Sequence, residues 1–321
     1  MRKPIFVGID VSARELVVAA GQQQWIFENT ATGHRRLVRK LTRGGRNARV
    51  VVEATGIYHL DLALALHEAK GTEVMVANPR AVRDFGRARF QRSKTDGTDA
   101  AVLLAFAERM PFEPWQPPPP EIQALRALSR RISSLTRTVA QERNRLHAAR
   151  DAAVREDIET LLPELEQHIV RVTEQALEII QSHDDLAHRF QHLISVKGIG
   201  KTSAVRLLSE LSVLPSDMTC RQWVAHAGLD PRHEQSGTSI SKPPRISKVG
   251  NRHIRAALYM PALVAIQHEP NVAAFYDALI ARGKKPKQAV VAVMRKLLHS
   301  IYGMLHHNED FEGTKFYAIS A

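Results

Sequence analysis

The sequence predicts an α/β domain at residues 1–115, a proline spacer and helical coiled coil at residues 116–191, and a mainly α-helical domain at residues 192–321. Three observations lead to this division. Short apolar runs alternate with helical patterns over the first hundred residues. Six prolines then occur within residues 111–120, which is typical of a stiff spacer. Beyond them, leucine and isoleucine recur at three- and four-residue steps, as in a pair of long packed helices.

The elements of the α/β domain follow from the spacing of its apolar residues. We expect strands at residues 5–9, 16–20, 25–27, 50–52 and 73–77, and helices at residues 32–41, 58–70 and 99–109. The first three strands follow one another directly, which indicates antiparallel hairpins. The later strands alternate with helices, which indicates a mostly parallel sheet.

The rest of the chain is expected to be helical. After the spacer we expect a helical hairpin or coiled coil, broken near residues 156–163. Apolar helices are also expected at residues 253–265 and 287–305. Between two helical stretches, Gly198-Ile199-Gly200 resembles a helix-hairpin-helix turn, whose backbone amides can approach a phosphate. Residues 230–250 are rich in Gly, Ser, Pro and Arg and are expected to form a loop.

The charge balance points to a polyanionic partner. The chain has 45 Lys and Arg against 33 Asp and Glu, a formal net charge of +12, and nucleic acid is the commonest polyanion. Its single cysteine, Cys220, excludes an intramolecular disulfide framework and a multi-cysteine zinc or iron–sulfur site. No apolar run approaches the roughly 18 residues of a membrane helix. We therefore expect a soluble, cytoplasmic protein that has no membrane partner.

Four carboxylates stand where ligands gather in α/β folds. Asp10 and Glu53 each follow the apolar run of a predicted strand. Asp96 and Asp99 lie three residues apart at the start of a predicted helix, so they share one face. Each acid alone also fits an ordinary role, such as a turn residue or a helix N-cap. Together they predict a site whose mutual repulsion needs a cation, and Mg²⁺ is the natural partner of oxygen ligands and phosphates.

Basic residues gather in two segments of the chain. One segment precedes Asp96, and the other spans the polar loop at residues 230–250. Cations spaced among small residues suit contacts with backbone phosphates, although a solvated face is the ordinary alternative. The nucleic-acid-binding residues that we expect, including the two glycines of the hairpin-like turn, are Arg83, Arg87, Arg92, Lys94, Gly198, Gly200, Arg232, Arg245, Lys248 and Arg252.

Motifs along nearly the whole chain occur in the order of one known family. They include Gly8-Ile9-Asp10-Val11-Ser12, Glu53-Ala54-Thr55-Gly56, Lys94-Thr95-Asp96-Gly97-Thr98-Asp99, Ala225-His226-Ala227-Gly228-Leu229-Asp230, Ser236-Gly237-Thr238-Ser239 and Arg255-Ala256-Ala257-Leu258-Tyr259. These motifs resemble the DEDD insertion-sequence transposases, which are bridge-RNA-guided recombinases. The resemblance implies an N-terminal RuvC-like, RNase H-like domain and a C-terminal transposase domain.

The resemblance also implies a reaction and its residues. The family's metal-binding acids and its nucleophilic serine fall on Asp10, Glu53, Asp96, Asp99 and Ser236. The serine would attack DNA to give a phosphoserine link, in a composite site where the acids of one protomer meet the serine of another. A noncoding bridge RNA would pair with donor and target DNA at the bacterial nucleoid. The active complex would be a tetramer, and the coiled coil by itself indicates at least a dimer.

Two other functions stay open on the sequence. A metal-dependent, structure-specific DNA nuclease would use water as its nucleophile and would not need Ser236. A non-catalytic protein would be either an RNA-binding scaffold or a decayed transposase, and the joint presence of the serine and the four acids argues against decay. The residues alone do not single out Ser236, because its loop carries several serines.

Overall fold

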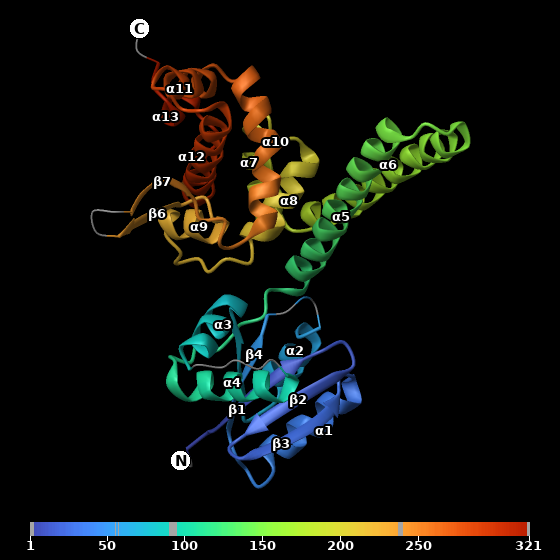
Figure 1. Cartoon of the computed structure of the whole chain (residues 1–321), viewed down its shortest axis with the longest axis vertical. Coiled ribbons are helices and arrows are strands. Elements are labelled where there is room, and N and C mark those ends of the chain that lie inside the picture. Colours follow the sequence, from blue (N-terminus) through green and yellow to red (C-terminus); the bar gives the residue numbers. More distant parts are fainter. Residues whose placement is uncertain (1–2, 55, 57, 90–94, 237–239, 320–321) are drawn as a thin grey trace. The chain divides into compact units, whose positions relative to one another are not determined.

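The computed structural model describes residues 3–54, 56, 58–89, 95–236 and 240–319, and the side chains of residues 233–244 lie outside this description. The chain divides into two compact units, Met1–Pro117 and Pro118–Ala321 (Figure 1). Within the described stretches, no helix is both long enough and apolar enough to cross a membrane.

The first unit is built on a five-stranded mixed sheet, which confirms the α/β prediction. Its strands are β1 (Ile5–Val11), β2 (Glu15–Ala20), β3 (Gln23–Glu28), β4 (Ala48–Glu53) and β5 (Thr72–Ala77), in the order β3-β2-β1-β4-β5. As expected, the first three strands form antiparallel hairpins. Strands β1, β4 and β5 run parallel to one another, since helices connect them.

Helices cover both faces of this sheet. On one face, α1 (Ala31–Thr42) and α2 (Leu60–Glu68) bury leucines against Val7, Ile9, Val50 and Val52. On the other face, α3 (Pro79–Ala88) and α4 (Asp96–Arg109) pack over Val51 and Ala77. The sequence analysis did not predict α3. Its signal was present in Asn78-Pro79, because the Asn78 side chain accepts a hydrogen bond from the Arg80 amide and Pro79 opens the helix.

One glycine sets the distance between the sheet and α4. A Cβ atom on Gly8 of β1 would overlap the backbone of Ala100, Leu103 and Leu104. The helix backbone therefore lies directly on the strand, with no side chain between them at this point. Ala100, Leu103 and Leu104 are buried around this contact.

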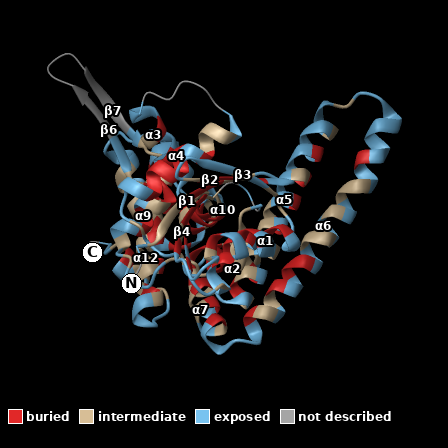
Figure 2. Ribbon diagram, turned by 90° about the horizontal axis from the view of Figure 1, so that it is seen from below, coloured by how far each residue is buried: buried red, intermediate tan, exposed pale blue. Residues whose placement is uncertain are grey.

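Two long helices open the second unit. α5 (Pro120–Ala148) and α6 (Ala152–Gln181) lie side by side as a helical hairpin (Figures 1 and 2). The expected break near residues 156–163 is wrong, because the helices part at residues 149–151. There the Asp151 carboxylate accepts hydrogen bonds from the amides of Ala153 and Val154, at 3.0 and 3.2 Å, and so begins α6. Pro163 lies inside α6, where it removes one backbone hydrogen bond without ending the helix.

Within the described residues of the second unit, seven further helices pack around one apolar core. They are α7 (Asp184–Ser195), α8 (Lys201–Leu211), α9 (Cys220–Ala227), α10 (Arg252–His268), α11 (Pro270–Ala281), α12 (Pro286–His307) and α13 (Gly313–Phe316). The prediction of apolar helices at residues 253–265 and 287–305 is confirmed by α10 and α12. Buried residues are frequent where these helices pack, whereas α6 is mostly exposed or partly exposed (Figure 2).

The expected loop at residues 230–250 is instead a two-stranded antiparallel ribbon. It consists of β6 (Pro231–Ser236) and β7 (Ile240–Ile246). β7 contains two consecutive prolines, Pro243 and Pro244. A two-stranded ribbon tolerates proline because each strand has one outer edge whose amides need no partner strand.

We predict that Gly8→Ala destabilises the first unit by about 1–3 kcal/mol, since the new methyl group must push α4 off β1. Chemical unfolding followed by circular dichroism measures this change. Gly86→Ala is the matched control, because its Cβ would meet only the side chain of Val102, at 3.5 Å. A helical alanine there should leave stability equal or slightly higher. Equal stabilities for the two variants would contradict the close contact at Gly8.

Candidate active site

Strand register places Asp10 beside Glu53. Ile9 of β1 pairs with Val52 of β4, so the residues that follow them stand next to each other where the parallel strands end. Because side chains alternate along a strand, both acids project to the face that Gly8 presents to α4. The carboxyl ends of parallel strands are where α/β folds bind ligands.

Helix α4 brings the other two acids to the same edge. Asp96 and Asp99 lie in its first turn, one turn before the residues that lie on Gly8. Thr95 begins the helix by accepting a hydrogen bond from the Thr98 amide, and the Thr98 hydroxyl accepts one from the Thr95 amide. Gln24 of β3 donates to the Gly97 carbonyl oxygen at 2.9 Å and so ties this turn to the sheet.

The charges of the four acids act on one another. Partial burial raises the pKa of Asp10, and the negative charges of Asp99, Asp96 and Glu53 raise it further. Each of these carboxylates therefore lies within electrostatic range of Asp10. The acids come from three separate segments of the sequence, and folding brings them to one edge of the sheet.

The donor chemistry of this edge fits a hard divalent cation. All four side chains offer carboxylate oxygens, and a bound cation would offset the repulsion that raises the pKa of Asp10. Within the described residues, no three His, Cys, Asp or Glu side chains are already arranged as a set of metal ligands.

A hydrogen-bond relay that starts at the buried His34 and runs through the half-buried Asn29 supports the loops that follow Asp10 and Glu53. The Asn29 amide group donates to the Ser12 carbonyl oxygen at 2.8 Å and to the Tyr58 carbonyl oxygen at 3.1 Å. Its own oxygen lies 2.7 Å from Nε2 of His34. Burial lowers the pKa of His34, and the charge of Asp61 opposes this shift only in part, so the imidazole is neutral and donates through Nε2. The sequence analysis missed this relay, since a lone Asn in a turn carries no such signal.

The proposed nucleophile lies in the other unit. Ser236 ends β6, where its backbone pairs with Ile240, and its side chain lies outside the described part of the chain. Two of the expected nucleic-acid contacts, Arg232 and Arg245, are exposed and stand directly opposite each other on the two strands.

The other two expected contacts in this region, Lys248 and Arg252, have exposed side chains near the base of the ribbon. Lys248 has a left-handed backbone conformation with φ 53° and donates its amide to the Gly228 carbonyl oxygen at 3.1 Å. Arg252 is the first residue of α10. Both side chains are free to reach a phosphate backbone, as the sequence analysis expects.

The other expected nucleic-acid contacts are spread over both units. Arg83 and Arg87 lie on the exposed side of α3, and Arg87 is 3.9 Å from Asp84. Arg92 and Lys94 lie outside the described residues. Gly200 is exposed at the start of α8, whereas Gly198, with φ 110°, lies close against the backbone of Pro261 and Ala265 in α10. Close packing is thus sufficient to explain Gly198, and phosphate binding there stays a prediction.

Comparison with known proteins places this geometry in a class. Residues 7–153 match a family described as "Transposase", and residues 190–277 match one described as "Transposase IS116/IS110/IS902 family". The first match contains all four acids, and the second contains Ser236. The protein is therefore a transposase, an enzyme that cuts and rejoins DNA.

Three relatives are similar in sequence to this chain over most of its length. A pilin gene-inverting protein of Moraxella bovis is 28% identical over 317 residues, 96% of this chain and 97% of that protein. A second, from Moraxella lacunata, is 30% identical over 266 residues, 82% of this chain and 81% of that protein. The transposase of the insertion sequence IS1328 from Yersinia enterocolitica is 28% identical over 222 residues, 61% of this chain and 65% of that protein. The chain belongs to the IS110 family of transposases.

We predict that Asn29→Ala lowers the free energy of unfolding of the first unit by about 1–2 kcal/mol, because two carbonyl oxygens and His34 lose a partner. Urea unfolding measures the loss. Gln22→Ala, in the exposed turn between β2 and β3, is the control and should change stability by less than about 0.5 kcal/mol. An Asn29 variant as stable as the Gln22 variant would show that the relay does not support these loops.

Proposed function

We propose that this transposase cuts and rejoins DNA through a phosphoserine intermediate at Ser236, with the help of Asp10, Glu53, Asp96 and Asp99. The observation that carries the proposal is the convergence of four acids at one edge of the sheet, where partial burial and the charges of the other three raise the pKa of Asp10. Acids held together against their own repulsion cost stability, and functional sites are where proteins accept such a cost.

A RuvC-like, RNase H-like assignment of the first unit supports this reading. Three antiparallel strands followed by two parallel ones, in the order β3-β2-β1-β4-β5, are consistent with that fold. The resemblance of the motifs points the same way. In this assignment Asp10 lies on the central strand and the acids of α4 face it.

The proposed chemistry keeps the number of phosphodiester bonds constant. Oγ of Ser236 forms a bond to phosphorus, and the bond from phosphorus to the oxygen of the leaving strand breaks. The serine hydroxyl loses its proton and the leaving oxygen gains one. A new strand end can then attack the phosphoserine, so the strands are exchanged without an external energy source.

The four acids would hold Mg²⁺, which supplies Lewis-acid stabilisation of the phosphate when bound. Asp10 and Glu53 would fix the cation from the sheet, and Asp96 and Asp99 would fix it from α4. The acids belong to the first unit and Ser236 to the second, joined through a proline-rich segment. This division suits a composite site in which two protomers each contribute one half, in a dimer or tetramer.

Guidance by a bridge RNA fits the kind of basic residues that the chain offers. Arg83, Arg87, Arg245 and Arg252 are exposed and suit contacts with phosphates, which position a nucleic acid without reading its sequence. Base pairing between the RNA and the donor and target DNA would then supply the sequence specificity.

A metal-dependent nuclease that uses water is the competing function. The relatives from Moraxella are described as gene-inverting proteins, and inversion requires that cut strands be rejoined. Rejoining favours a covalent intermediate over hydrolysis, because the covalent link conserves the energy of the bond.

We predict that Ser236→Ala abolishes the covalent protein–DNA species, since alanine has no oxygen to attack phosphorus, while binding of co-purifying RNA persists. The measurement is denaturing electrophoresis of the full chain incubated with Mg²⁺, its co-purified RNA and DNA that carries the ends of its element. Ser241→Ala, on the opposite strand of the ribbon, is the control and should retain the adduct. Cleavage by Ser236→Ala at the wild-type rate would instead identify water as the nucleophile.

A further inference from the structure

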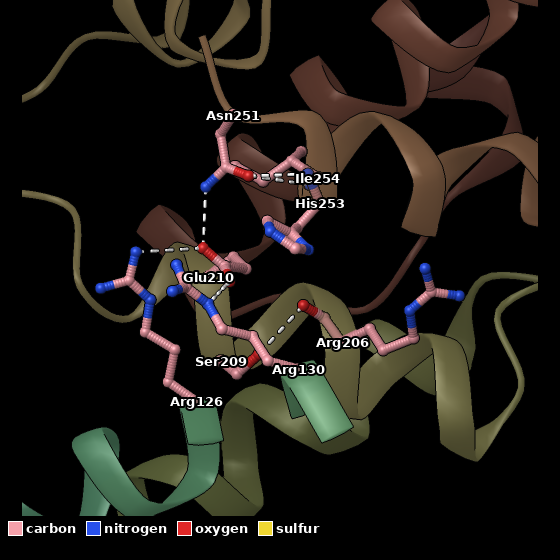
Figure 3. Close-up of polar contacts among 8 residues, drawn as sticks. All are labelled: Arg126, Arg130, Arg206, Ser209, Glu210, Asn251, His253 and Ile254. Atoms are coloured by element: carbon pink, nitrogen blue, oxygen red, sulfur yellow. Dashed lines mark hydrogen bonds and ion pairs between the residues drawn. The ribbon is translucent and has the colours of Figure 1, made fainter. Parts of the chain in front are cut away.

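A buried carboxylate joins three helices of the second unit. Glu210 of α8 is fully buried, at 0% exposure. Two arginines of α5 reach it: Nη2 of Arg126 lies 3.4 Å from Oε2, and Nε of Arg130 lies 3.2 Å from Oε1. From the start of α10, Nδ2 of Asn251 donates to Oε2 at 2.8 Å (Figure 3). An acid in this position needs such partners, because burial without them is costly.

The electrostatics show that Glu210 is ionised. Burial by itself would raise its pKa, but the charge of Arg126, the hydrogen bond from Asn251 and the charge of Arg130 outweigh burial and lower the pKa. The nearby imidazoles of His226 and His253 have pKa values lowered by burial, so they are neutral at pH 7. The ion pairs of Glu210 with the two arginines therefore add to the apolar packing between α5 and α8.

Asn251 carries this attachment to the base of the ribbon. Its side-chain oxygen begins α10 by accepting hydrogen bonds from the amides of His253 and Ile254 (Figure 3). Its backbone amide donates to the His226 carbonyl oxygen at 2.6 Å. One residue thus binds Glu210, caps α10 and joins the end of α9.

The segments on both sides of the ribbon are bonded to each other beside Asn251. The Lys248 amide donates to the Gly228 carbonyl oxygen at 3.1 Å, and the Ser247 amide donates to the Asp230 carbonyl oxygen at 2.9 Å. Gly250, with φ 119°, lies so close to the His226 carbonyl that a Cβ would overlap it. The strand that leads to Ser236 begins at Pro231, directly after this junction. A small rotation at the junction would therefore be amplified along β6.

We propose that Glu210 is a positioning residue for Ser236: its ionic attachment to α5 and its hydrogen bond to Asn251 fix the direction in which the ribbon presents the serine. This inference rests on the proposed function of Ser236. It assigns α5, the first helix after the proline spacer, a part in the alignment of the nucleophile. Misplacement of a reacting group by about 1 Å can cost about 10²-fold in rate.

The test exchanges the two ends of the hydrogen bond. Glu210→Gln removes the charge, and Asn251→Asp keeps the cap of α10 but turns a carboxylate toward Glu210. The double variant, Glu210→Gln with Asn251→Asp, restores a donor facing a carboxylate and keeps one negative charge beside Arg126 and Arg130. Glu142→Gln is the control, since Glu142 is also buried and pairs with an arginine, Arg145, on its own helix.

Two measurements on the full chain test whether Glu210 positions Ser236, and both are made below the unfolding temperature of every variant. Hydrogen exchange at the amides of Lys248 and Asn251 should quicken in each single variant, and the rate of adduct formation should fall about 10- to 100-fold. The double variant should recover both to near wild type, and Glu142→Gln should change neither.

Unchanged exchange at Lys248 and Asn251 in both single variants would overturn the proposal whatever the chemistry. Adduct rates at the wild-type level in the single variants would overturn it while leaving the phosphoserine mechanism intact. If the wild-type protein forms no serine-linked adduct, the proposed function is wrong, and Glu210 then has no nucleophile to position. Rescue in the double variant would assign both effects to the interaction between positions 210 and 251, and a fall in adduct rate without faster exchange at Lys248 and Asn251 would contradict the proposed route through the junction.

Discussion

The direct contact between α4 and β1 at Gly8 is the constraint on which the acidic site depends. Because the helix backbone lies on the strand, the first turn of α4 falls level with Asp10, two residues beyond the glycine. Asp96 and Asp99 thereby face Asp10, and the register of β1 with β4 adds Glu53. A larger residue at position 8 would separate the acids of the helix from those of the sheet. The repulsion among these carboxylates is tolerated because the surrounding core is well packed.

In the second unit, the corresponding question is what fixes the direction of the ribbon formed by β6 and β7. The sequence of its ribbon contains few apolar residues, so the direction of the ribbon must come from its base. There, Asn251, Gly228 and Gly250 are fixed by backbone hydrogen bonds and close approaches. Glu210 contacts this junction through its hydrogen bond from Asn251, and its ion pairs connect the junction to the arginines of α5. The two units thus differ in their electrostatics. The acids of the first unit repel one another, whereas the buried carboxylate of the second unit is paired with arginines.

Much of the fold was predictable, and the exceptions have physical causes. The strands and helices of the first unit followed from apolar periodicity, and the order of hairpins and crossovers followed from the spacing between them. Helix α3 was missed because its charged residues masked a narrow buried side at Val82 and Gly86. The ribbon was missed because two prolines and few apolar residues gave it no strand pattern. The candidate acids were visible as residues that follow apolar runs, but the supporting contacts of Asn29 and Glu210 join segments far apart in sequence and have no local signature.

Anomalous scattering from crystals of the full chain grown with Mn²⁺, a divalent cation with the oxygen preference of Mg²⁺, tests the central claim most directly. We expect a peak at the edge formed by β1, β4 and α4. Oxygens of Asp10 and of at least one acid of α4 should lie roughly 2.0–2.2 Å from the manganese ion. The peak should be lost in Asp10→Asn. A fully occupied manganese elsewhere, with none at this edge, would contradict the claim that the packing of α4 on Gly8 assembles a metal site.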